Sequence, residues 1–321
     1  NDSPVYNTQP TRDYNEADTA RASMASANSP RRRKQNSRRP CICLMRCSSF
    51  SAWDVLRLSE TEMNILLIGC GKMGGAMLRQ WVGNDDNRFT VADPAVSDLP
   101  EGVRHVAKAT ELTAAEFDVV LIAIKPQMIA AILPDYAYSL KPDGCFVSIA
   151  AGCSIDTIAR IVGQKAIVRV MPNLAAMVGL GVSGLYANGN CTDQKTAYVT
   201  DLVAETGTCI QLSSEDEIDR LTAVSGSGPG YIFEVMRSYV EAAKSIGFDD
   251  ETARTLVMDT ITGTVETARQ SPETLEELRN SVTSKNGTTQ AGLAELMRDG
   301  TLDVLLQKTV QAACNRAAEL K

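Results

Sequence analysis

The sequence predicts an α/β protein, in which a Rossmann-type, doubly wound parallel sheet is followed by an all-helical domain. Between residues 63 and 216, short apolar runs alternate with helical segments, a pattern typical of parallel strands joined by crossover helices. A glycine-rich turn, Gly69-Cys70-Gly71-Lys72-Met73-Gly74, follows the first run. Over residues 217–321 only helical patterns remain. The chain therefore divides into a Rossmann domain at 63–216 and a helical domain at 217–321.

Composition narrows the class of protein. A chain of 321 residues with 44% hydrophobic and 22% charged residues is ordinary for a globular enzyme of about two domains. The net charge of −7 and 5% aromatic content argue against nucleic acid and against an anionic membrane surface as partners. No apolar run is long enough to span a membrane, so no membrane segment is expected. The single histidine, His105, excludes a His-rich site, and no metal is expected.

Residues 1–62 differ from the rest of the chain. They carry ten Lys or Arg against seven Asp or Glu, a net charge of +3, whereas residues 63–321 carry 22 against 32, a net charge of −10. No sustained apolar period runs through them, so we expect a disordered, dispensable extension outside the native protein, with Met63 as the natural start. The six cysteines after residue 62 are scattered singly, which favours a reducing, cytoplasmic location.

The expected elements follow from the periodicity of apolar residues. Strands are expected at 64–68, 89–92, 119–124, 146–150 and 166–170, with two more candidates at 182–186 and 208–212. Helices of the Rossmann domain are expected from the glycine turn to about Trp81 and at 127–133, 154–162 and 193–205.

Six helices are expected in the second domain, at 218–224, 231–246, 250–269, 272–280, 289–298 and 302–320. Asp249, Ser271 and Thr288 are plausible N-caps. Apolar residues recur on more than one face of the helices expected at 231–246 and 250–269. Because a domain of about 100 residues cannot cover so many apolar faces, we expect a homodimer formed through residues 231–321.

The glycine turn has the context of a dinucleotide-binding fingerprint, since a strand precedes it and a helix follows it. Its glycines allow a tight turn, close approach of a pyrophosphate and close helix–strand packing. Asp93 lies nineteen residues after Gly74, at the end of the second strand, where an acid accepts a hydrogen bond from a ribose 2′-hydroxyl. The alternatives are a glycine turn without a ligand and an Asp-Pro turn without a cofactor role.

Other strands end in segments suited to a ligand, because ligands lie at the carboxyl edge of a doubly wound sheet. Ala123-Ile124-Lys125-Pro126 would face the cofactor, although Lys125 could equally be a solvated loop lysine. Ala150-Ala151-Gly152 offers backbone near the nicotinamide, and Asn173 could point its amide at the substrate.

Two glycine-rich segments interrupt the helical domain, at Ser225–Tyr231 and at Ser284–Thr289. A glycine-rich helix entry presents free backbone N–H groups, which suit a carboxylate. Ordinary helix capping is the alternative for each segment alone, but two such entries in one small domain favour a binding function.

Taken together, these motifs resemble those of the pyrroline-5-carboxylate reductase family. The resemblance runs from Met63 to the end of the chain and is carried by the segments 69–74, 123–126, 168–173, 225–229 and 282–289. The chain departs from the family pattern at Gly230, where the family usually has Ala, and at Asn286, where it has Gly. Both changes are small or permissive for the backbone.

The resemblance implies reduction of 1-pyrroline-5-carboxylate to L-proline with NADPH or NADH, the last step of proline biosynthesis, in a dimer or a ring of dimers. The implied cofactor residues are Gly69, Cys70, Gly71, Lys72, Met73, Gly74, Asp93, Ala123, Ile124, Lys125, Pro126, Ala151 and Gly152. The implied substrate residues are Asn173, Ser225, Gly226, Ser227, Gly228, Gly287, Thr288 and Thr289, with the Thr289 hydroxyl beside the ring nitrogen as the catalytic group. The alternatives are another imine or 3-hydroxyacid reductase of the same architecture and a non-catalytic nucleotide-sensing dimer.

Overall fold

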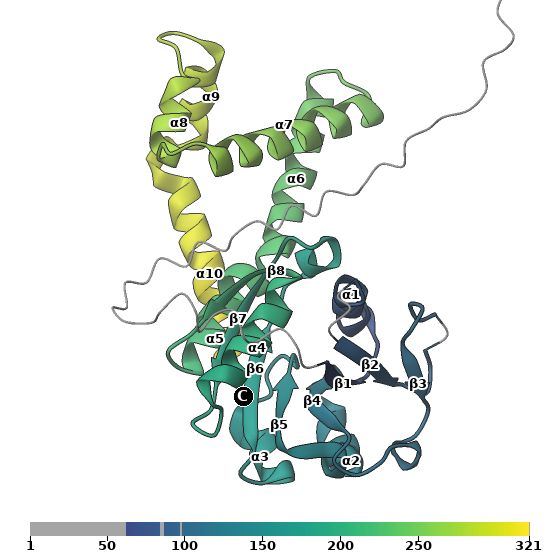
Figure 1. Cartoon of the computed structure of the whole chain (residues 1–321). Helices are drawn as coiled ribbons and strands as arrows, with labels where there is room; N and C mark the ends of the chain where they lie inside the picture. Colours follow the sequence, from purple (N-terminus) through teal and green to yellow (C-terminus); the bar gives the residue numbers. More distant parts are fainter. Residues whose placement is uncertain (1–61, 84–86, 97, 321) are drawn as a thin grey trace, which may run out of the picture. The chain divides into compact units, whose positions relative to one another are not determined.

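A computed structural model describes residues 62–83, 87–96 and 98–320 (Figure 1). The extension expected at 1–62 lies outside the described residues, apart from Glu62. The strands are β1 (Met63–Ile68), β2 (Asn87–Ala92), β3 (Arg104–Val106), β4 (Phe117–Ile122), β5 (Leu140–Ser148), β6 (Ala166–Met171), β7 (Gly181–Ala187) and β8 (Gly207–Gln211). The helices are α1 (Lys72–Trp81), α2 (Pro126–Tyr136), α3 (Ile155–Val162), α4 (Asp193–Ala204), α5 (Asp216–Leu221), α6 (Gly228–Ser245), α7 (Asp250–Gln270), α8 (Leu275–Ser281), α9 (Thr288–Leu296) and α10 (Thr301–Glu319).

The eight strands form one sheet in the order β3-β2-β1-β4-β5-β6-β7-β8. Since β1 pairs with both β2 and β4, the chain winds outward in both directions from β1, which confirms the doubly wound Rossmann-type fold. All pairs are parallel except β6 with β7. Residues 172–180, which connect these two strands, are too few for the crossover that parallel pairing requires.

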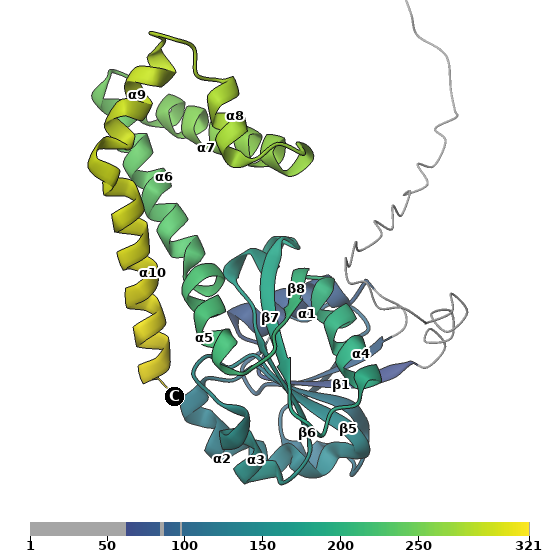
Figure 2. The same cartoon turned by 90° about the vertical axis from the view of Figure 1, so that its left-hand side faces the viewer.

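The sheet is buried on both faces, as its apolar strands predict. One face packs against α1 and α4, where Trp81 stacks on Phe89 and donates a 2.7 Å hydrogen bond to the carbonyl of Leu202. The other face packs against α2 and α3. Figures 1 and 2 show this three-layer arrangement.

Three strands differ most from the prediction. β3 was not predicted, because it has three residues and only Val106 is buried. β4 begins and ends two residues earlier than expected. β5 begins at Leu140 rather than 146, and its exposed Pro142-Asp143 segment hides the apolar pattern.

The helical domain follows the prediction in number of helices but not in how they begin. Asp249 caps α7 as predicted, since its Oδ1 accepts a 2.7 Å hydrogen bond from the N–H of Thr252. The prediction was wrong for Ser271, which follows the end of α7, while Thr274 caps α8. It was also wrong for Thr288, the first residue of α9, because Gly287 occupies the N-cap position.

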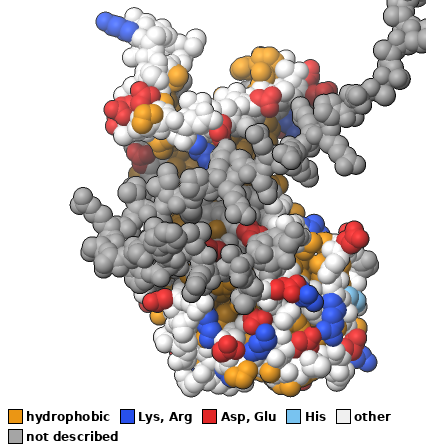
Figure 3. Space-filling view, in the orientation of Figure 1, with side chains coloured by type: hydrophobic (Ala, Val, Ile, Leu, Met, Phe, Trp, Pro, Cys, Tyr) orange, Lys and Arg blue, Asp and Glu red, His pale blue; other side chains and the backbone are white. Residues whose placement is uncertain are grey.

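The helical domain buries very few side chains within one chain. Its buried cluster consists of Ala243, Ala253 and Val257, where α6 packs against α7. Large apolar side chains lie exposed on the remaining faces, among them Phe233, which is 57% exposed, and Leu305. Apolar side chains are visible among charged ones over this domain in Figure 3. Within the described residues, no helix is long and apolar enough to cross a membrane.

Candidate dinucleotide-binding and active site

The glycine turn has the geometry that its sequence predicts. Gly69 has φ +88°, a left-handed conformation that favours glycine. A Cβ atom on Gly74 would lie 2.8 Å from the carbonyl oxygen of Gly69 and 3.0 Å from the Cβ of Ala123. Any larger residue at Gly74 would therefore push α1 away from β1 and β4.

The N-terminus of α1 is open to an anion. Gly71 is the N-cap, no side chain caps the helix, and no acidic residue lies in its first turn. The first N–H groups of a helix have no partner within it, so they are available to a phosphate. A Cβ on Gly71 would meet no atom within 4 Å, which means that the turn borders open space.

That open space is a cavity of about 980 Å³ at the carboxyl ends of β1, β2 and β4. It has the size of a cofactor site and lies where doubly wound sheets bind dinucleotides. The predicted residues that line it are Gly69, Gly71, Asp93, Ala123, Ile124 and Lys125. Cys70, Lys72, Met73, Gly74 and Pro126 belong to the same segments but lie outside its lining.

Sequence reasoning missed two walls of the cavity. One is the turn at residues 107–110 after β3, and the other is formed by α2 and the residues after it, through Met128, Ile132 and Tyr138. The first wall was missed because β3 is too short and polar to be recognised. The second could have been inferred, since α2 directly follows the predicted ligand segment 123–126.

Asp93 is fastened to the glycine turn. Its Oδ2 accepts a 2.7 Å hydrogen bond from the N–H of Cys70, and its Oδ1 accepts a 2.9 Å bond from the N–H of Ala95. Burial and the negative charge of Asp93 raise the pKa of the Cys70 thiol. The exposed His105 lies with its Nε2 2.8 Å from the carbonyl oxygen of Asp93, so it supports this turn rather than facing the substrate residues.

Gly152 meets the end of the helical domain. It has φ +71°, and a Cβ there would lie 3.1 Å from the carbonyl oxygen of Leu320, just beyond α10. Ala151 and Gly152 lie outside the lining of the large cavity. The turn predicted to face the nicotinamide is therefore packed against the C-terminal helix.

The segment around Ser225 is not the helix break that the sequence predicts. Thr222–Gly226 form a π-helical turn that joins α5 to α6, and the N–H of Ser227 donates a 2.8 Å hydrogen bond to the carbonyl of Thr222. The expectation of free N–H groups at this entry is therefore wrong for Ser227. π-helical turns occur frequently at functional sites.

Asn173 holds this turn against the sheet domain. Its side-chain amide donates a 3.1 Å hydrogen bond to the carbonyl of Ser225 and accepts a 3.1 Å bond from the N–H of Val182. A Cβ on Gly226 would lie 3.2 Å from the Cε of Met171, so the turn packs closely on the end of β6. The structure thus brings the predicted Asn173 and Ser225–Gly226 together.

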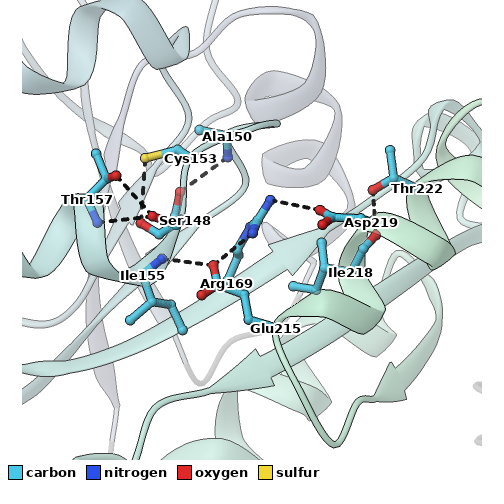
Figure 4. A network of polar contacts seen from close by, with 11 residues as sticks. Ser148, Ala150, Cys153, Ile155, Thr157, Arg169, Glu215, Ile218, Asp219 and Thr222 are labelled. Atoms are coloured by element: carbon cyan, nitrogen blue, oxygen red, sulfur yellow. Dashed lines mark hydrogen bonds and ion pairs between the residues drawn. The ribbon is translucent and has the colours of Figure 1, made fainter. Parts of the chain in front are cut away.

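A buried ion-pair network lies beside this junction (Figure 4). Arg169 on β6 is 3% exposed; its Nη1 lies 2.8 Å from Oε1 of Glu215, and its Nη2 lies 4.0 Å from Oδ1 of Asp219. The same Glu215 oxygen accepts a 2.9 Å hydrogen bond from the N–H of Ile155 at the start of α3. In the sequence, this network is marked by a charged residue inside the otherwise apolar strand 166–170.

Thr288 and Thr289 begin α9, and both are exposed. The turn before them is tight: Asn286 has φ +60°, and its N–H donates a 2.6 Å hydrogen bond to the side chain of Gln290. Within one chain, α8 and α9 lie at the end of the helical domain that is remote from the sheet (Figures 1 and 2). The structure therefore does not bring Gly287, Thr288 or Thr289 to the cavity of the same chain.

The fold, the open glycine turn and the cavity define a Rossmann-type, dinucleotide-dependent oxidoreductase with a helical second domain. Residues 64–152 match the family described as NADP oxidoreductase coenzyme F420-dependent, and residues 215–320 match the family described as Pyrroline-5-carboxylate reductase dimerisation. The chain is 34% identical to a pyrroline-5-carboxylate reductase of Pseudomonas aeruginosa, over 80% of this chain and 96% of that protein. The chain is 32% identical to a pyrroline-5-carboxylate reductase of Haemophilus influenzae, over 80% of this chain and 97% of that protein.

Solved structures of pyrroline-5-carboxylate reductases have a similar fold. A pyrroline-5-carboxylate reductase from Coxiella burnetii has a TM-score of 0.75 and 31% identity, covering 81% of this chain and 99% of that one. A Plasmodium falciparum pyrroline carboxylate reductase with NADP bound has a TM-score of 0.70 and 26% identity, covering 80% of this chain and 98% of that one. The chain belongs to the pyrroline-5-carboxylate reductase family, as its motifs predict.

Proposed function

We propose that this protein reduces 1-pyrroline-5-carboxylate to L-proline with NADPH or NADH. The observation that carries the proposal is the open glycine turn beside a 980 Å³ cavity, in a chain whose other motifs are those of the family. The open N-terminus of α1 would hold the pyrophosphate, and the ends of β2 and β4 would hold the adenosine half.

The chemistry asks little of the protein beyond orientation. A cyclic imine is already electrophilic and largely protonated near neutral pH, so an acid catalyst contributes little, and no catalytic histidine is needed. When bound, the reduced nicotinamide supplies the hydride. The residues of this chain would hold the ring in position and exclude water, which is catalysis by proximity.

The carboxylate of the substrate fits the N-terminus of α9. Gly287 is the N-cap and carries no capping side chain, so the N–H groups of Thr288 and Thr289 have no partner within the helix. The Thr289 hydroxyl would accept a hydrogen bond from the protonated ring nitrogen. Asn173 and the π-helical turn would complete the pocket from the side of the sheet domain.

A second copy of the chain would complete the site. The α9 entry is remote from the cavity within one chain, whereas the exposed apolar faces of α6 and α10 need a cover. A homodimer formed through residues 231–321 would bury these faces and bring the α9 entry of one chain to the cavity of the other. Sedimentation velocity distinguishes such a dimer from a ring of dimers.

We place this reaction in the cytoplasm. Six cysteines in the described part of the chain are free thiols, as a reducing compartment requires.

The test is NAD(P)H oxidation with racemic 1-pyrroline-5-carboxylate, compared with oxidation of 3-hydroxyacids in the reverse direction. Turnover of the imine alone supports the proposal. Turnover of the hydroxyacids instead identifies a different reductase, and cofactor binding without turnover of either identifies a nucleotide sensor.

A further inference from the structure

We infer that Asp93 makes this protein select NADH over NADPH. The inference rests on the proposed function only in taking a bound nicotinamide dinucleotide as the reductant. It is carried by the carboxylate and by the hydrogen-bond donors around it, at the place where NADH and NADPH differ.

The two cofactors differ at the adenosine ribose, which carries a 2′-hydroxyl in one and a 2′-phosphate in the other. In a Rossmann-type fold this ribose lies at the end of the second strand. Asp93 directly follows β2 and lines the cavity. Its carboxylate is held in place by the N–H groups of Cys70 and Ala95.

These two hydrogen bonds leave room for the ribose. An ionised carboxylate has about four acceptor positions, and the backbone uses two of them. The remaining two can accept hydrogen bonds from ribose hydroxyls. A 2′-phosphate would instead bring negative charge against a carboxylate that its backbone bonds prevent from turning away.

Three backbone donors near this position, the N–H groups of Ala95, Ala107 and Lys108, are already engaged. The N–H of Ala95 is bonded to Asp93 itself. The N–H groups of Ala107 and Lys108, on the facing turn, both donate to Oε1 of Glu111, at 3.0 and 2.8 Å. Glu111 therefore fills the backbone site of that turn with a second carboxylate.

The charged side chains that line the cavity do not favour a 2′-phosphate either. No arginine is among the described residues that line it, although arginine is the usual partner of a 2′-phosphate. Arg104, on the neighbouring strand β3, is paired with Glu116 at 2.5 Å. Lys108 and Lys125 line the cavity together with Asp93 and Asp135, so the lining carries no net positive charge.

The experiment measures binding of NADH and NADPH to the full chain by fluorescence, in the absence of substrate. The affinities of adenosine 5′-monophosphate and adenosine 2′,5′-bisphosphate, which lack the fluorescent nicotinamide, are compared by their competition with NADH. We expect the wild type to bind NADH at least about 10-fold more tightly than NADPH, because juxtaposed like charges disfavour the wrong ligand. Equal affinity, or tighter binding of NADPH, would overturn the inference.

The variant Asp93→Asn tests whether Asp93 sets the preference for NADH. Asparagine keeps an acceptor for the N–H of Cys70, loses the bond from the N–H of Ala95 and removes the charge, so the preference should fall several-fold, mainly through tighter NADPH binding. Asp135→Asn is the matched control, because it removes a second carboxylate from the same cavity. An unchanged ratio in Asp93→Asn, or an equal change in Asp135→Asn, would show that Asp93 is not the selector. Since no substrate is present, failure of the proposed reaction leaves this result intact.

Discussion

The sheet domain and the helical domain are buried to very different extents. The sheet domain buries apolar side chains on both faces and by itself forms the cavity beside the glycine turn. The helical domain buries only five apolar residues, three of them in the cluster between α6 and α7, and exposes large ones along α6, α7 and α10. One chain therefore contains a sheet domain with its own core and cavity, and a helical domain whose apolar faces are left uncovered. This difference supports the proposal that the catalytic unit is larger than one chain.

The largest expected effect concerns the junction of the two domains. Arg169→Met removes a buried guanidinium from between Glu215 and Asp219. Breaking a buried ion pair from one side costs about 3–5 kcal/mol, so the free energy of unfolding should fall by about that amount in chemical denaturation. Arg88→Met, which breaks an exposed pair with Glu62 on the sheet domain, is the control and should leave the free energy of unfolding nearly unchanged. Equal effects would mean that the junction is not buried in solution.

The next effect concerns the substrate. In Thr289→Ala, loss of a hydrogen bond to a charged group, about 1.5–3 kcal/mol, should lower kcat/KM about 10- to 150-fold. The melting temperature should hold, because Gly287 and not a threonine is the N-cap of α9. The affinity for the cofactor should also remain unchanged, since the glycine turn lies in the other domain. A lowered melting temperature with unchanged kcat/KM would assign Thr289 a structural role instead.

A similar effect is expected on assembly. Phe233→Ser removes a large exposed side chain from α6. If the second copy covers it, the lost burial of about 1.5–3 kcal/mol should raise the dimer dissociation constant by about 10- to 150-fold in sedimentation equilibrium. Ile210→Ser, on β8 of the sheet domain, removes an exposed apolar side chain and should leave the constant unchanged. If Ile210→Ser dissociates the dimer and Phe233→Ser does not, the interface lies on the sheet domain.

The smallest effect is on acid stability. Burial opposes ionisation of Glu116, but hydrogen bonds from Thr113 and the pairing with Arg104 outweigh it, so the pKa of this carboxyl lies below its ordinary value of 4.5. The folded pKa is depressed, so this group stabilises the fold above pH 4.5, and the contribution is lost as the pH falls through the folded pKa. Glu116→Gln should cost at most about 1 kcal/mol at neutral pH, because Arg104 is half exposed, and nothing at the lowest pH. A constant difference from pH 7 to pH 2 would contradict this.

Strong local patterns made most of the fold predictable. The apolar strands, the glycine turn and Asp93 could be read directly, because each depends on neighbouring residues. β3, the antiparallel pairing of β7 and the π-helical turn could not, since they depend on sheet pairing and on packing between Gly226 and Met171. The Arg169 network joins residues 46 to 50 positions apart, which no local pattern links.

The central claim is that the cavity of one chain works with the α9 entry of its partner, and mixed dimers test it directly. Gly71→Asp places a carboxylate in open space at the pyrophosphate position, so it should fold but not bind cofactor. This variant is coexpressed with Thr289→Ala under two different tags, and the heterodimer is purified on both. If each site combines two chains, one site carries both changes and the other carries none, so the heterodimer should retain about half of the wild-type activity. Activity no higher than the mean of the two variant homodimers would show that each chain builds its site alone.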